Sequence, residues 1–490
     1  MPTLSMTFNF VRIMVVNWYS LFQIFYVLIT VYTILVIIYY GRRPTKSISW
    51  VLAVIVLPFA GPILFYLFGV NRRKFKFFSH KQTAKRKAFK QDASKEMNAF
   101  RINFDNNIQY QKISSLVSNS SYTSVLGENQ VDVLHDGEAT FGDLFKALES
   151  AKDFIHIQYY SIEPGKLLDR LFDVFKKKIE QGVKILVLYD SFGSYRFRGK
   201  LKKKFESIGV MTLPVMPIRF GNLLFSLNFR NHRKIVVVDG KVAFTGGVNI
   251  SDNYIDSDTE LGRWKDAHLQ LHGPIVHDIH LILLKDYFFA SSKDSFDPTR
   301  FMRDPKPMGN VKAQVVAGGP DSEQPVIMQQ YIAMIGGAKK YIHIVNPYFL
   351  PGQPFLEALK IAVQSKIEVK LLIPEKSDSL AARYAMFSQF EDLLAVGVRI
   401  FLRKDFSHSK IMLVDGTMAS VGSGNFDNRS FEHNYETNVL IYDNTISINL
   451  SKEFESLCEQ SQELKLDTFL KRPKWEKFLE GISKFFKPLL

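Results

Sequence analysis

The sequence predicts an α/β protein: two duplicated α/β halves related by a pseudo-two-fold axis, preceded by an N-terminal hairpin of two transmembrane helices. Three observations predict this arrangement. Two apolar runs fill most of the first 70 residues, strand-like and helix-like runs alternate beyond residue 125, and one polar motif occurs twice. With 490 residues, the chain has room for two or three domains.

The two apolar runs differ in how well they suit a membrane. Trp18–Tyr40 contains no charged residue and matches the ~20 residues that a helix needs to cross a bilayer. Ile48–Val70 contains Pro58, Gly61 and Pro62, so we expect a kinked or re-entrant segment. A pair of buried core helices is the alternative. The first run is too long for a cleaved signal peptide, and no obvious cleavage site follows it.

Basic residues lie beside both apolar runs. The link between the runs holds Arg42, Arg43 and Lys46, and residues 71–90 contain nine Lys or Arg. This excess predicts that the main body lies in the cytoplasm. The single cysteine, Cys458, excludes an intramolecular disulfide, which suits a reducing compartment.

The whole chain is basic, with 63 Lys or Arg against 48 Asp or Glu and a net charge of +15. Such a surplus attracts polyanions, either nucleic acid or anionic lipid, and the hairpin favours a lipid bilayer as the partner. A soluble basic face is the alternative. The tail Phe469–Leu490 mixes aromatic and basic residues at helical spacing, which fits either a helix on the bilayer or an ordinary docking helix.

Sequence similarity within the chain indicates a duplication. Ala147–Ile162 and Met334–Phe349 each read as a helix end followed by an Ile-His-Ile strand, and a further helix and strand follow in both halves. We therefore divide the chain into four parts. They are residues 1–70, the hairpin; 71–125, a basic connector; 126–310, the first half; and 311–490, the second half with a basic amphipathic segment at its end.

The polar motif lies at equivalent places in the two halves. Each copy reads His-x-Lys, four residues, Asp, and then Gly-Gly or Gly-Ser. The residues are His232, Lys234 and Asp239 in the first copy and His408, Lys410 and Asp415 in the second. Residues two apart on a strand share a face, so each histidine and its lysine point the same way. If the pseudo-axis brings the two faces together, two imidazoles and two ammonium groups converge.

Such a cluster suits chemistry on a phosphodiester. One imidazole attacks phosphorus and forms a phosphohistidine, while the other protonates the leaving alcohol and later deprotonates the incoming one. The lysines offset the charge that grows on the phosphoryl oxygens, so we expect neither a metal nor a cofactor. A single histidine on a strand is usually structural, but two copies in register favour catalysis.

Other residues are expected to support the two histidines. Glu436 and Asp266 lie at matching places in the halves, and we expect each to orient one imidazole. We also expect Asn249, Ser423 and Asn425 to donate hydrogen bonds, Gly247 to let a phosphate approach the backbone, and Arg429 to contact phosphate. Asp239 and Asp415 each precede glycine in a predicted turn, which favours a structural role for both.

These motifs resemble those of the phospholipase D superfamily. The segments 42–69, 228–254, 263–274 and 408–436 are similar to bacterial cardiolipin synthases, and the resemblance covers nearly the whole chain. It implies two phospholipase D-like domains and the transfer of a phosphatidyl group from one phosphatidylglycerol to another, giving cardiolipin and glycerol. It also implies that both His-x-Lys-x-x-x-x-Asp sets are catalytic, in a multi-pass protein of the bacterial cell membrane.

Several alternatives remain open at this stage. A membrane-bound phospholipase D hydrolase and a phosphatidylserine synthase would use the same motif, and a scaffold that binds anionic lipid would not need it intact. A nuclease has no reason for a membrane hairpin. The sequence does not decide whether His232 or His408 is the nucleophile, nor the oligomeric state. We expect Phe220–Phe229, an apolar stretch, to face the membrane or to line the route by which lipid reaches the site.

Overall fold

The computed structural model describes residues 3–40, 44–69, 96–216, 229–256, 261–291, 298–322 and 324–486. The chain forms two compact units, Met1–Phe77 with Arg219–Asn228, and Phe78–Ile218 with Phe229–Leu490. The basic run at 71–90 and all of the apolar stretch Phe220–Phe229 except Phe229 lie outside the described residues.

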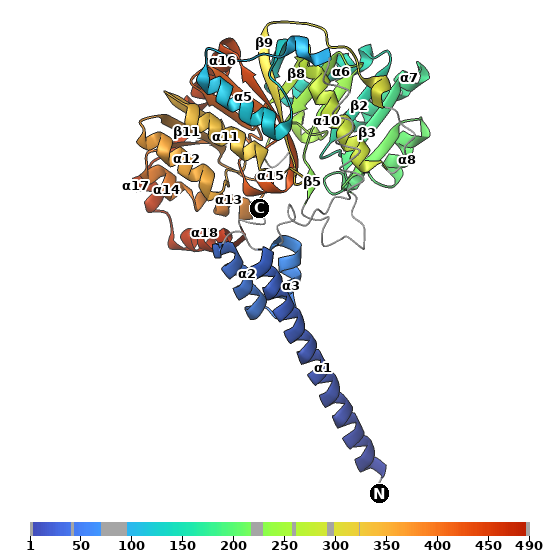
Figure 1. Ribbon diagram of the computed structural model, residues 1–490, viewed down its shortest axis with the longest axis vertical. Coiled ribbons are helices and arrows are strands. Elements are labelled where there is room, and N and C mark those ends of the chain that lie inside the picture. The colour runs from blue at the N-terminus through green and yellow to red at the C-terminus, as the bar shows by residue number, and fades with distance from the viewer. Residues whose placement is uncertain are drawn as a thin grey trace. The chain divides into compact units, whose positions relative to one another are not determined.

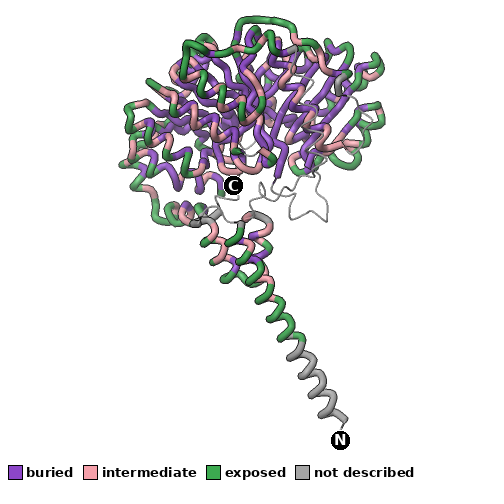
Figure 2. The backbone as a smooth tube through the Cα atoms, in the orientation of Figure 1, coloured by how far each residue is buried: buried purple, intermediate pink, exposed green. Residues whose placement is uncertain are grey.

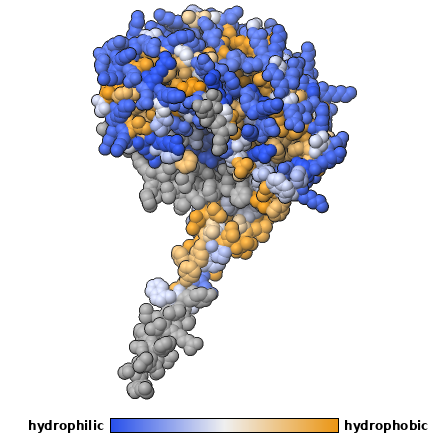
Figure 3. All heavy atoms as spheres, turned by 180° about the vertical axis from the view of Figure 1, so that it is seen from behind, coloured by the Kyte–Doolittle hydropathy of each residue, from blue (hydrophilic) through white to orange (hydrophobic). Residues whose placement is uncertain are grey.

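The N-terminal unit is helical (Figure 1). Its elements are α1 (Thr3–Tyr40), α2 (Pro44–Val56), α3 (Ala60–Leu64) and a π-helical turn, η1 (Phe65–Gly69). Within the described residues, one helical segment, Ser20–Tyr39, is long and apolar enough to cross a membrane. Many large apolar side chains along it are more than half exposed, including Leu21, Leu28 and Ile38, and Figure 3 shows this apolar surface. Such a surface is stable in lipid rather than in water.

The second apolar run is broken and does not form one long helix, which confirms the expected kink, while its crossing of the membrane stays a prediction. Helix α2 has 13 residues and ends before Pro58, which has no N–H for a helical hydrogen bond. Phe59 then adopts a left-handed conformation, with φ 58°. Gly61 packs directly on the backbone of Ala53 and Val54, where a side chain would not fit. The segment therefore folds back on α2.

The larger unit is built on one continuous sheet of 16 described strands. On the first-half side the order is β1 (Leu126–Leu134), β8 (His268–His272), β7 (Val242–Gly246), β6 (Ile235–Val238), β2 (Phe154–Tyr159), β3 (Lys184–Asp190) and β4 (Met211–Val215). On the second-half side it is β9 (Val311–Gly318), β15 (Asn434–Tyr442), β14 (Met418–Gly422), β13 (Ile411–Val414), β10 (Tyr341–Val345), β11 (Glu368–Pro374), β12 (Arg399–Arg403) and β16 (Gln462–Leu464).

These two orders mirror each other across the antiparallel β1–β9 pair. In each half a parallel β-strand trio, β2–β3–β4 or β10–β11–β12, is joined to antiparallel strands that carry the repeated motif. The predicted duplication and its pseudo-two-fold relation are therefore confirmed at the level of topology. A short strand, β5 (Arg230–Asn231), lies off this path and pairs with β15.

Helices cover the sheet on both sides (Figure 1). The first half contributes α6 (Gly137–Ser150), α7 (Lys166–Glu180), α8 (Lys200–Ser207) and α10 (Ile275–Ala290). The second half contributes α11 (Val326–Gly337), α12 (Gln353–Gln364), α13 (Leu380–Phe387), α14 (Phe390–Ala395), α15 (Asn428–Glu432), α16 (Asn444–Glu459), α17 (Leu466–Leu470) and α18 (Lys474–Phe486). Short 3-10 turns are η2 (Glu96–Phe100), η3 (Tyr195–Phe197), η5 (Asp252–Tyr254) and η6 (Pro298–Phe301).

The two halves share a hydrophobic core. One buried cluster contains Ile279 and Leu283 of α10 together with Leu413, Val439 and Phe454 of the second half. Each half also has an outer cluster of its own, under its own helices, and most strand residues are buried (Figure 2). The halves are thus one packed body, because separating them would expose the shared core to water.

The end of the predicted connector belongs to this body. Helix α5 (Ile108–Ser121) buries Ile113 and Val117 in the core of the second half. Its last residue, Ser121, donates from Oγ to the carbonyl of Ala317 on β9 at 3.1 Å. The polar surface of this helix concealed its apolar stripe in the sequence, so the expected boundary at residue 125 does not mark a change in packing.

Candidate active site

Each histidine motif lies beside a strand of the opposite half. Strand β5, just before His232, pairs with β15, and the amide of His232 donates to the carbonyl of Tyr435 at 2.9 Å. The equivalent contact joins the amide of His408 to the carbonyl of Lys265 at 2.6 Å. The pseudo-axis therefore brings the two distant motifs to one place, as the sequence predicts.

The imidazoles pair with carboxylates across the axis. His232 Nδ1 lies 3.1 Å from Glu436 Oε2, and His408 Nδ1 lies 2.8 Å from Asp266 Oδ2. All four side chains are buried. A carboxylate beside Nδ1 fixes the ring and holds the proton on that nitrogen, which leaves Nε2 as the atom free to react. Each half thus orients the histidine of the other.

Two lysines complete the cluster, and neither is exposed. Lys234 Nζ donates to the carbonyl of His232 at 2.8 Å. Lys410 Nζ donates to the carbonyl of His408 and lies 2.7 Å from its Nδ1 and 3.9 Å from Asp266 Oδ2. Burial lowers the pKa of Lys234 to about 7 and that of Lys410 to about 8. A bound anion would favour the charged form of both lysines.

The two histidine–carboxylate pairs differ in the pKa shifts of their members. Burial lowers the pKa of His232 while Glu436 opposes that shift, and burial together with Lys410 and Lys234 lowers the pKa of His408 further. Burial raises the pKa of Glu436, but His232 outweighs it and holds that pKa below its ordinary value. In contrast, burial raises the pKa of Asp266 to about 6, against the neighbouring Lys410.

The two aspartates of the motif hold backbone rather than substrate. Asp239 accepts hydrogen bonds from the amides of Lys152, Asp153 and Phe154, at 2.8 to 2.9 Å. Asp415 accepts the equivalent three, from the amides of residues 339–341. Both aspartates have φ above +50°, in the turn before glycine. The carboxylates therefore fasten each motif hairpin to the neighbouring strand, which agrees with the turn reading and not with a catalytic assignment.

The structure shows what Ser423 supports, and it corrects the phosphate contact expected at Gly247. Ser423 Oγ donates to Glu436 Oε2 at 2.6 Å and accepts from the amide of Thr437 at 3.0 Å, so this hydroxyl positions the carboxylate. The amide of Gly247 is bonded to the carbonyl of Ala267 at 2.9 Å, and a side chain at Gly247 would overlap the carboxylate of Asp266. Gly247 thus makes room for Asp266 and not for a phosphate.

The remaining predicted residues are Asn249, Asn425 and Arg429. Asn249 Oδ1 accepts from the amide of Ser161 at 3.3 Å. Asn425 is 7% exposed, and its Oδ1 has no hydrogen-bond partner among the described residues. Arg429, on α15, is half-buried, and its charge acts on Tyr160. Asn425 therefore keeps an unbonded polar atom, and the charge of Arg429 acts on the ring beside His232.

More aromatic rings lie near His408 than near His232, and the sequence did not indicate them. The ring of Tyr160 lies 4.7 Å from that of His232. Around His408, Trp264 lies 5.6 Å, Tyr348 6.1 Å and Phe406 6.2 Å away between ring centres. The only sequence signal available was the repeat register, in which Arg230 of the first half is equivalent to Phe406 of the second.

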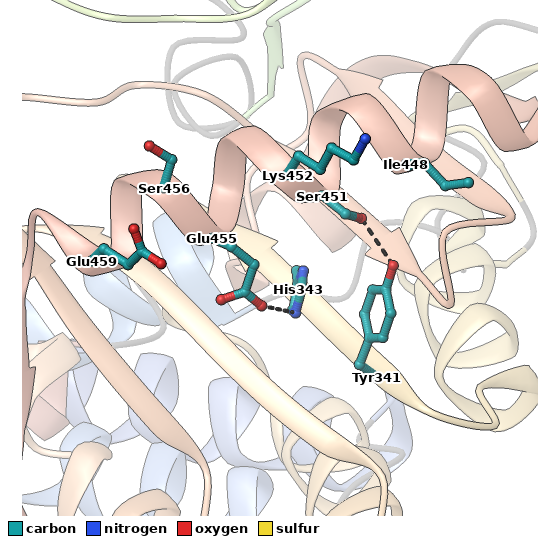
Figure 4. Close-up of a pocket in the computed structure, with 8 residues that line it drawn as sticks. All are labelled: Tyr341, His343, Ile448, Ser451, Lys452, Glu455, Ser456 and Glu459. Atoms are coloured by element: carbon teal, nitrogen blue, oxygen red, sulfur yellow. Dashed lines mark hydrogen bonds and ion pairs between the residues drawn. The ribbon is translucent and has the colours of Figure 1, made fainter.

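A different cluster offers metal-ligand atoms, in a surface pocket at α16 (Figure 4). Within the described part of the chain, His343, Glu368 and Glu455 form the one group whose ligand atoms lie within 4.8 Å of one another. Lys370 Nζ donates to both carboxylate oxygens of Glu455 at 2.8 Å and lies 3.3 Å from Glu368. Arg399 Nη1 also lies 3.4 Å from Glu368 Oε2, so two cations already pair with these two carboxylates, and the donor set does not fit a metal ion.

Comparison with known proteins identifies the family. The model of the "cardiolipin synthase, PLD-like domain" matches residues 144–272 and 331–458, one copy in each half, and a "phospholipase D-nuclease N-terminal" model matches residues 28–69. The chain belongs to the cardiolipin synthase family of the phospholipase D superfamily. As a member of this family it is a phosphatidyltransferase, and the resemblance seen in the sequence is confirmed.

Similar proteins span nearly the full chain. Cardiolipin synthase 2 of Bacillus anthracis is 35% identical over 92% of this chain and 88% of its own length. The major cardiolipin synthase ClsA of Bacillus subtilis is 34% identical over 96% of this chain and 99% of its own length. Among solved structures, phosphatidylserine synthase of Haemophilus influenzae has a TM-score of 0.59 at 14% identity, covering 77% of this chain and 98% of that one. This structure supports the fold alone.

Proposed function

We propose that this chain transfers a phosphatidyl group from one phosphatidylglycerol to a second, giving cardiolipin and glycerol through a covalent phosphohistidine. The observation that carries the proposal is the crossed pairing of His232 with Glu436 and of His408 with Asp266, beside two buried lysines. This arrangement offers two imidazoles with complementary roles and fixed positive charge for one phosphodiester.

In the first step, Nε2 of one imidazole attacks the phosphorus of phosphatidylglycerol. The bond between phosphorus and the headgroup glycerol oxygen breaks as the nitrogen–phosphorus bond forms. The second imidazole donates its proton to the leaving oxygen, so glycerol departs neutral. Lys234 and Lys410 stabilise the negative charge on the phosphoryl oxygens, because ammonium groups buried in a dry site act at low dielectric.

In the second step, the free primary hydroxyl of another phosphatidylglycerol replaces the departed glycerol. The second imidazole, now neutral, takes the hydroxyl proton as the oxygen bonds to phosphorus and the nitrogen–phosphorus bond breaks. Atoms balance, since two phosphatidylglycerols give one cardiolipin and one glycerol. His232 and His408 each have an orienting carboxylate, so either could be the nucleophile. Nitrophenol release by the variants H232Q and H408Q tells the two roles apart.

We further propose that the protein is a multi-pass protein of the bacterial cell membrane with its catalytic body in the cytoplasm. The apolar span Ser20–Tyr39 and the apolar helix Ser47–Val56 support insertion, and the basic residues beside them support this orientation. Protease added to inside-out vesicles should digest the body, whereas protease added to intact spheroplasts should leave it whole. The opposite pattern would reverse the orientation.

The proposed reaction is tested with labelled phosphatidylglycerol as the sole lipid in vesicles. Cardiolipin and glycerol as products support the transferase, whereas phosphatidic acid and glycerol would indicate a hydrolase. Formation of phosphatidylserine only when CDP-diacylglycerol and serine are supplied would indicate the serine-specific synthase. Wild-type protein that binds the vesicles and forms no product would indicate a scaffold. The double variant H232Q/H408Q is the matched control for contaminating activity.

A further inference from the structure

Arg230 is a buried cation that the proposed chemistry does not use. It is 1% exposed and stands two residues before His232 on β5. Its Nη1 lies 3.4 Å from Asp190 Oδ1, while its Nε and Nη2 are buried with no hydrogen-bond partner among the described residues. Leaving charged donors buried and unbonded is costly, so such donors mark a place where a ligand can bind.

The neighbour Asp190 does not account for this guanidinium. Its carboxylate already accepts hydrogen bonds from the amides of Phe192, Gly193 and Asn231, at 2.8 to 2.9 Å. Those bonds organise the loop after β3 without help from Arg230. The guanidinium makes one long contact to the carboxylate and lies 5.5 Å from the centre of the Phe192 ring, and its Nε and Nη2 have no hydrogen-bond partner among the described residues.

The place of Arg230 in the chain puts it beside the site of His232. Arg230 and His232 are alternate residues in one extended segment, so their side chains share a face and stand roughly 6.6 Å apart. Asn434, the register partner of Arg230, donates to Glu436 Oε1 at 3.2 Å, and its Oδ1 has no hydrogen-bond partner in the described part of the chain. The charges of Arg230 and Arg429 both act on Tyr160, whose ring contacts His232.

The second half has no such cation at the equivalent place. The repeat register puts Phe406 where the first half has Arg230, and Phe406 is buried 4.7 Å from the ring of Trp264. The lysines, in contrast, are the same in both halves. Arg233 is also buried on this side only, but it is bonded to Asp286 and to the carbonyl of Gly318. Lys234 and Lys410 together serve the reacting phosphate, so the unbonded donors of Arg230 point to a second anion.

We propose that Arg230, assisted by Arg429, binds the phosphate of the acceptor phosphatidylglycerol. This inference rests on the proposed function and adds a second phosphate subsite to it. The acceptor carries its own phosphodiester at the other end of the glycerol whose hydroxyl attacks, so the two phosphates lie only a few ångströms apart at the moment of transfer. That span is comparable with the separation of alternate strand residues, as between Arg230 and His232. A water or free glycerol acceptor has no phosphate and does not need the subsite.

The test compares two acceptors with one donor. Full-length protein in phosphatidylglycerol vesicles is given labelled glycerol, and two rates are measured: incorporation of label into phosphatidylglycerol, and formation of cardiolipin. Only the second rate needs an acceptor phosphate. We expect R230Q to lower the ratio of cardiolipin formation to glycerol exchange at least tenfold, and R230K to lower it less, because lysine keeps the charge and loses the fork of donors. R196Q, which removes an exposed arginine from the same half, is the matched control and should leave the ratio unchanged.

The outcomes separate this inference from the proposed function. If wild-type protein forms no cardiolipin, the proposed function fails whatever the variants do. If wild-type protein forms cardiolipin and R230Q lowers both rates equally, or neither, Arg230 is a structural partner of Asp190 and the subsite is refuted. Should R230Q fold poorly, the double variant R230Q/D190N removes both charges of the pair, and the same ratio decides.

Discussion

The surroundings of His232 and His408 differ although the two histidines occupy equivalent places. His232 lies among charged and polar groups, including Arg230, Asn434 and a glutamate held by the hydroxyl of Ser423. His408 lies among the rings of Trp264, Tyr348 and Phe406, beside an aspartate whose pKa is about 6. The backbone symmetry thus supplies the pair of catalytic groups, and the side chains that break the symmetry give each member its own task.

Removing either imidazole should cause the largest loss. We expect H232Q and H408Q each to lower cardiolipin formation by roughly 10³-fold or more, because one step of the transfer then lacks its nucleophile or its proton donor. A phosphatidyl ester of p-nitrophenol separates the two roles, since that leaving group needs no proton. The variant that still releases nitrophenol retains the nucleophile, and the variant that does not has lost it. Equal release by both would contradict a single covalent histidine.

Neutralising the crossed carboxylates should cause the next largest loss. We expect E436Q and D266N to lower kcat by about 10²-fold each, since an amide places the imidazole proton and its charge less well than a carboxylate does. Glu436 is the more firmly ionised of the two, so E436Q should be the more damaging. Steady-state kinetics with matched amounts of folded protein measure the comparison, and an unaffected kcat in either variant would refute the orienting role.

The pH dependence of kcat/KM should reveal the same difference between Asp266 and Glu436. A carboxyl with its pKa raised to about 6 is ionised above that pH and protonated below it, so kcat/KM should fall as pH drops through about 6 when Asp266 stops accepting from His408. D266N should flatten this acidic limb, whereas E436Q should retain it, because the pKa of Glu436 lies below its ordinary value. An acidic limb that persists in D266N would assign it to another group.

The two residues that support the carboxylates should differ in their tolerance of change. G247A introduces an atom into the space of the Asp266 carboxylate and should lower kcat by about tenfold, with a methyl group too small to add any other contact. S423A removes one hydrogen bond to Glu436 and should lower kcat only a few-fold. If S423A lowers kcat more than G247A does, the explanation from the space around the two carboxylates is wrong.

The motif aspartates should affect stability more than catalysis, and their kinetic effect should be the smallest. D239A and D415A each remove a carboxylate that accepts three backbone hydrogen bonds, so we expect a cost of about 2 kcal/mol or more in unfolding free energy. Thermal unfolding in detergent should show a lower Tm with kcat per folded molecule nearly kept. A loss of kcat as large as that of H232Q, with Tm unchanged, would show a direct catalytic role.

Residues close together in sequence predicted the motif hairpins, and the repeat register predicted the two carboxylates beside the histidines. Features that depend on contacts between distant parts of the chain were not predicted. The Asp239–Gly240 turn and strand β6 follow from residues next to one another in sequence, and Glu436 and Asp266 followed from the repeat register. The break in the second apolar run followed from Pro58, and the positive φ of Phe59 just after it was not visible in the sequence. Helix α5 was missed because its burial depends on a surface distant in sequence.

The functions of Ser423 and Gly247 could not be read from the sequence for a related reason. The two residues occupy the same place in the repeat and each adjoins a carboxylate, but one carboxylate is longer by a methylene than the other. The longer Glu436 leaves space for a hydroxyl, and the shorter Asp266 needs that space itself. This fit depends on a side chain from another strand, and the spacing of residues within one motif does not reveal that side chain.

The exchange of carboxylates across the axis has a consequence for how such a chain could arise. A half on its own holds an imidazole whose orienting carboxylate belongs to the other half, so an ancestor with one copy would have acted only as a pair of identical subunits. In that pair every substitution is made twice. Joining the copies in one polypeptide removed this constraint, and an arginine could then remain on one side while phenylalanine took its place on the other. Fusion thus allows the two sides of one symmetric site to carry different residues.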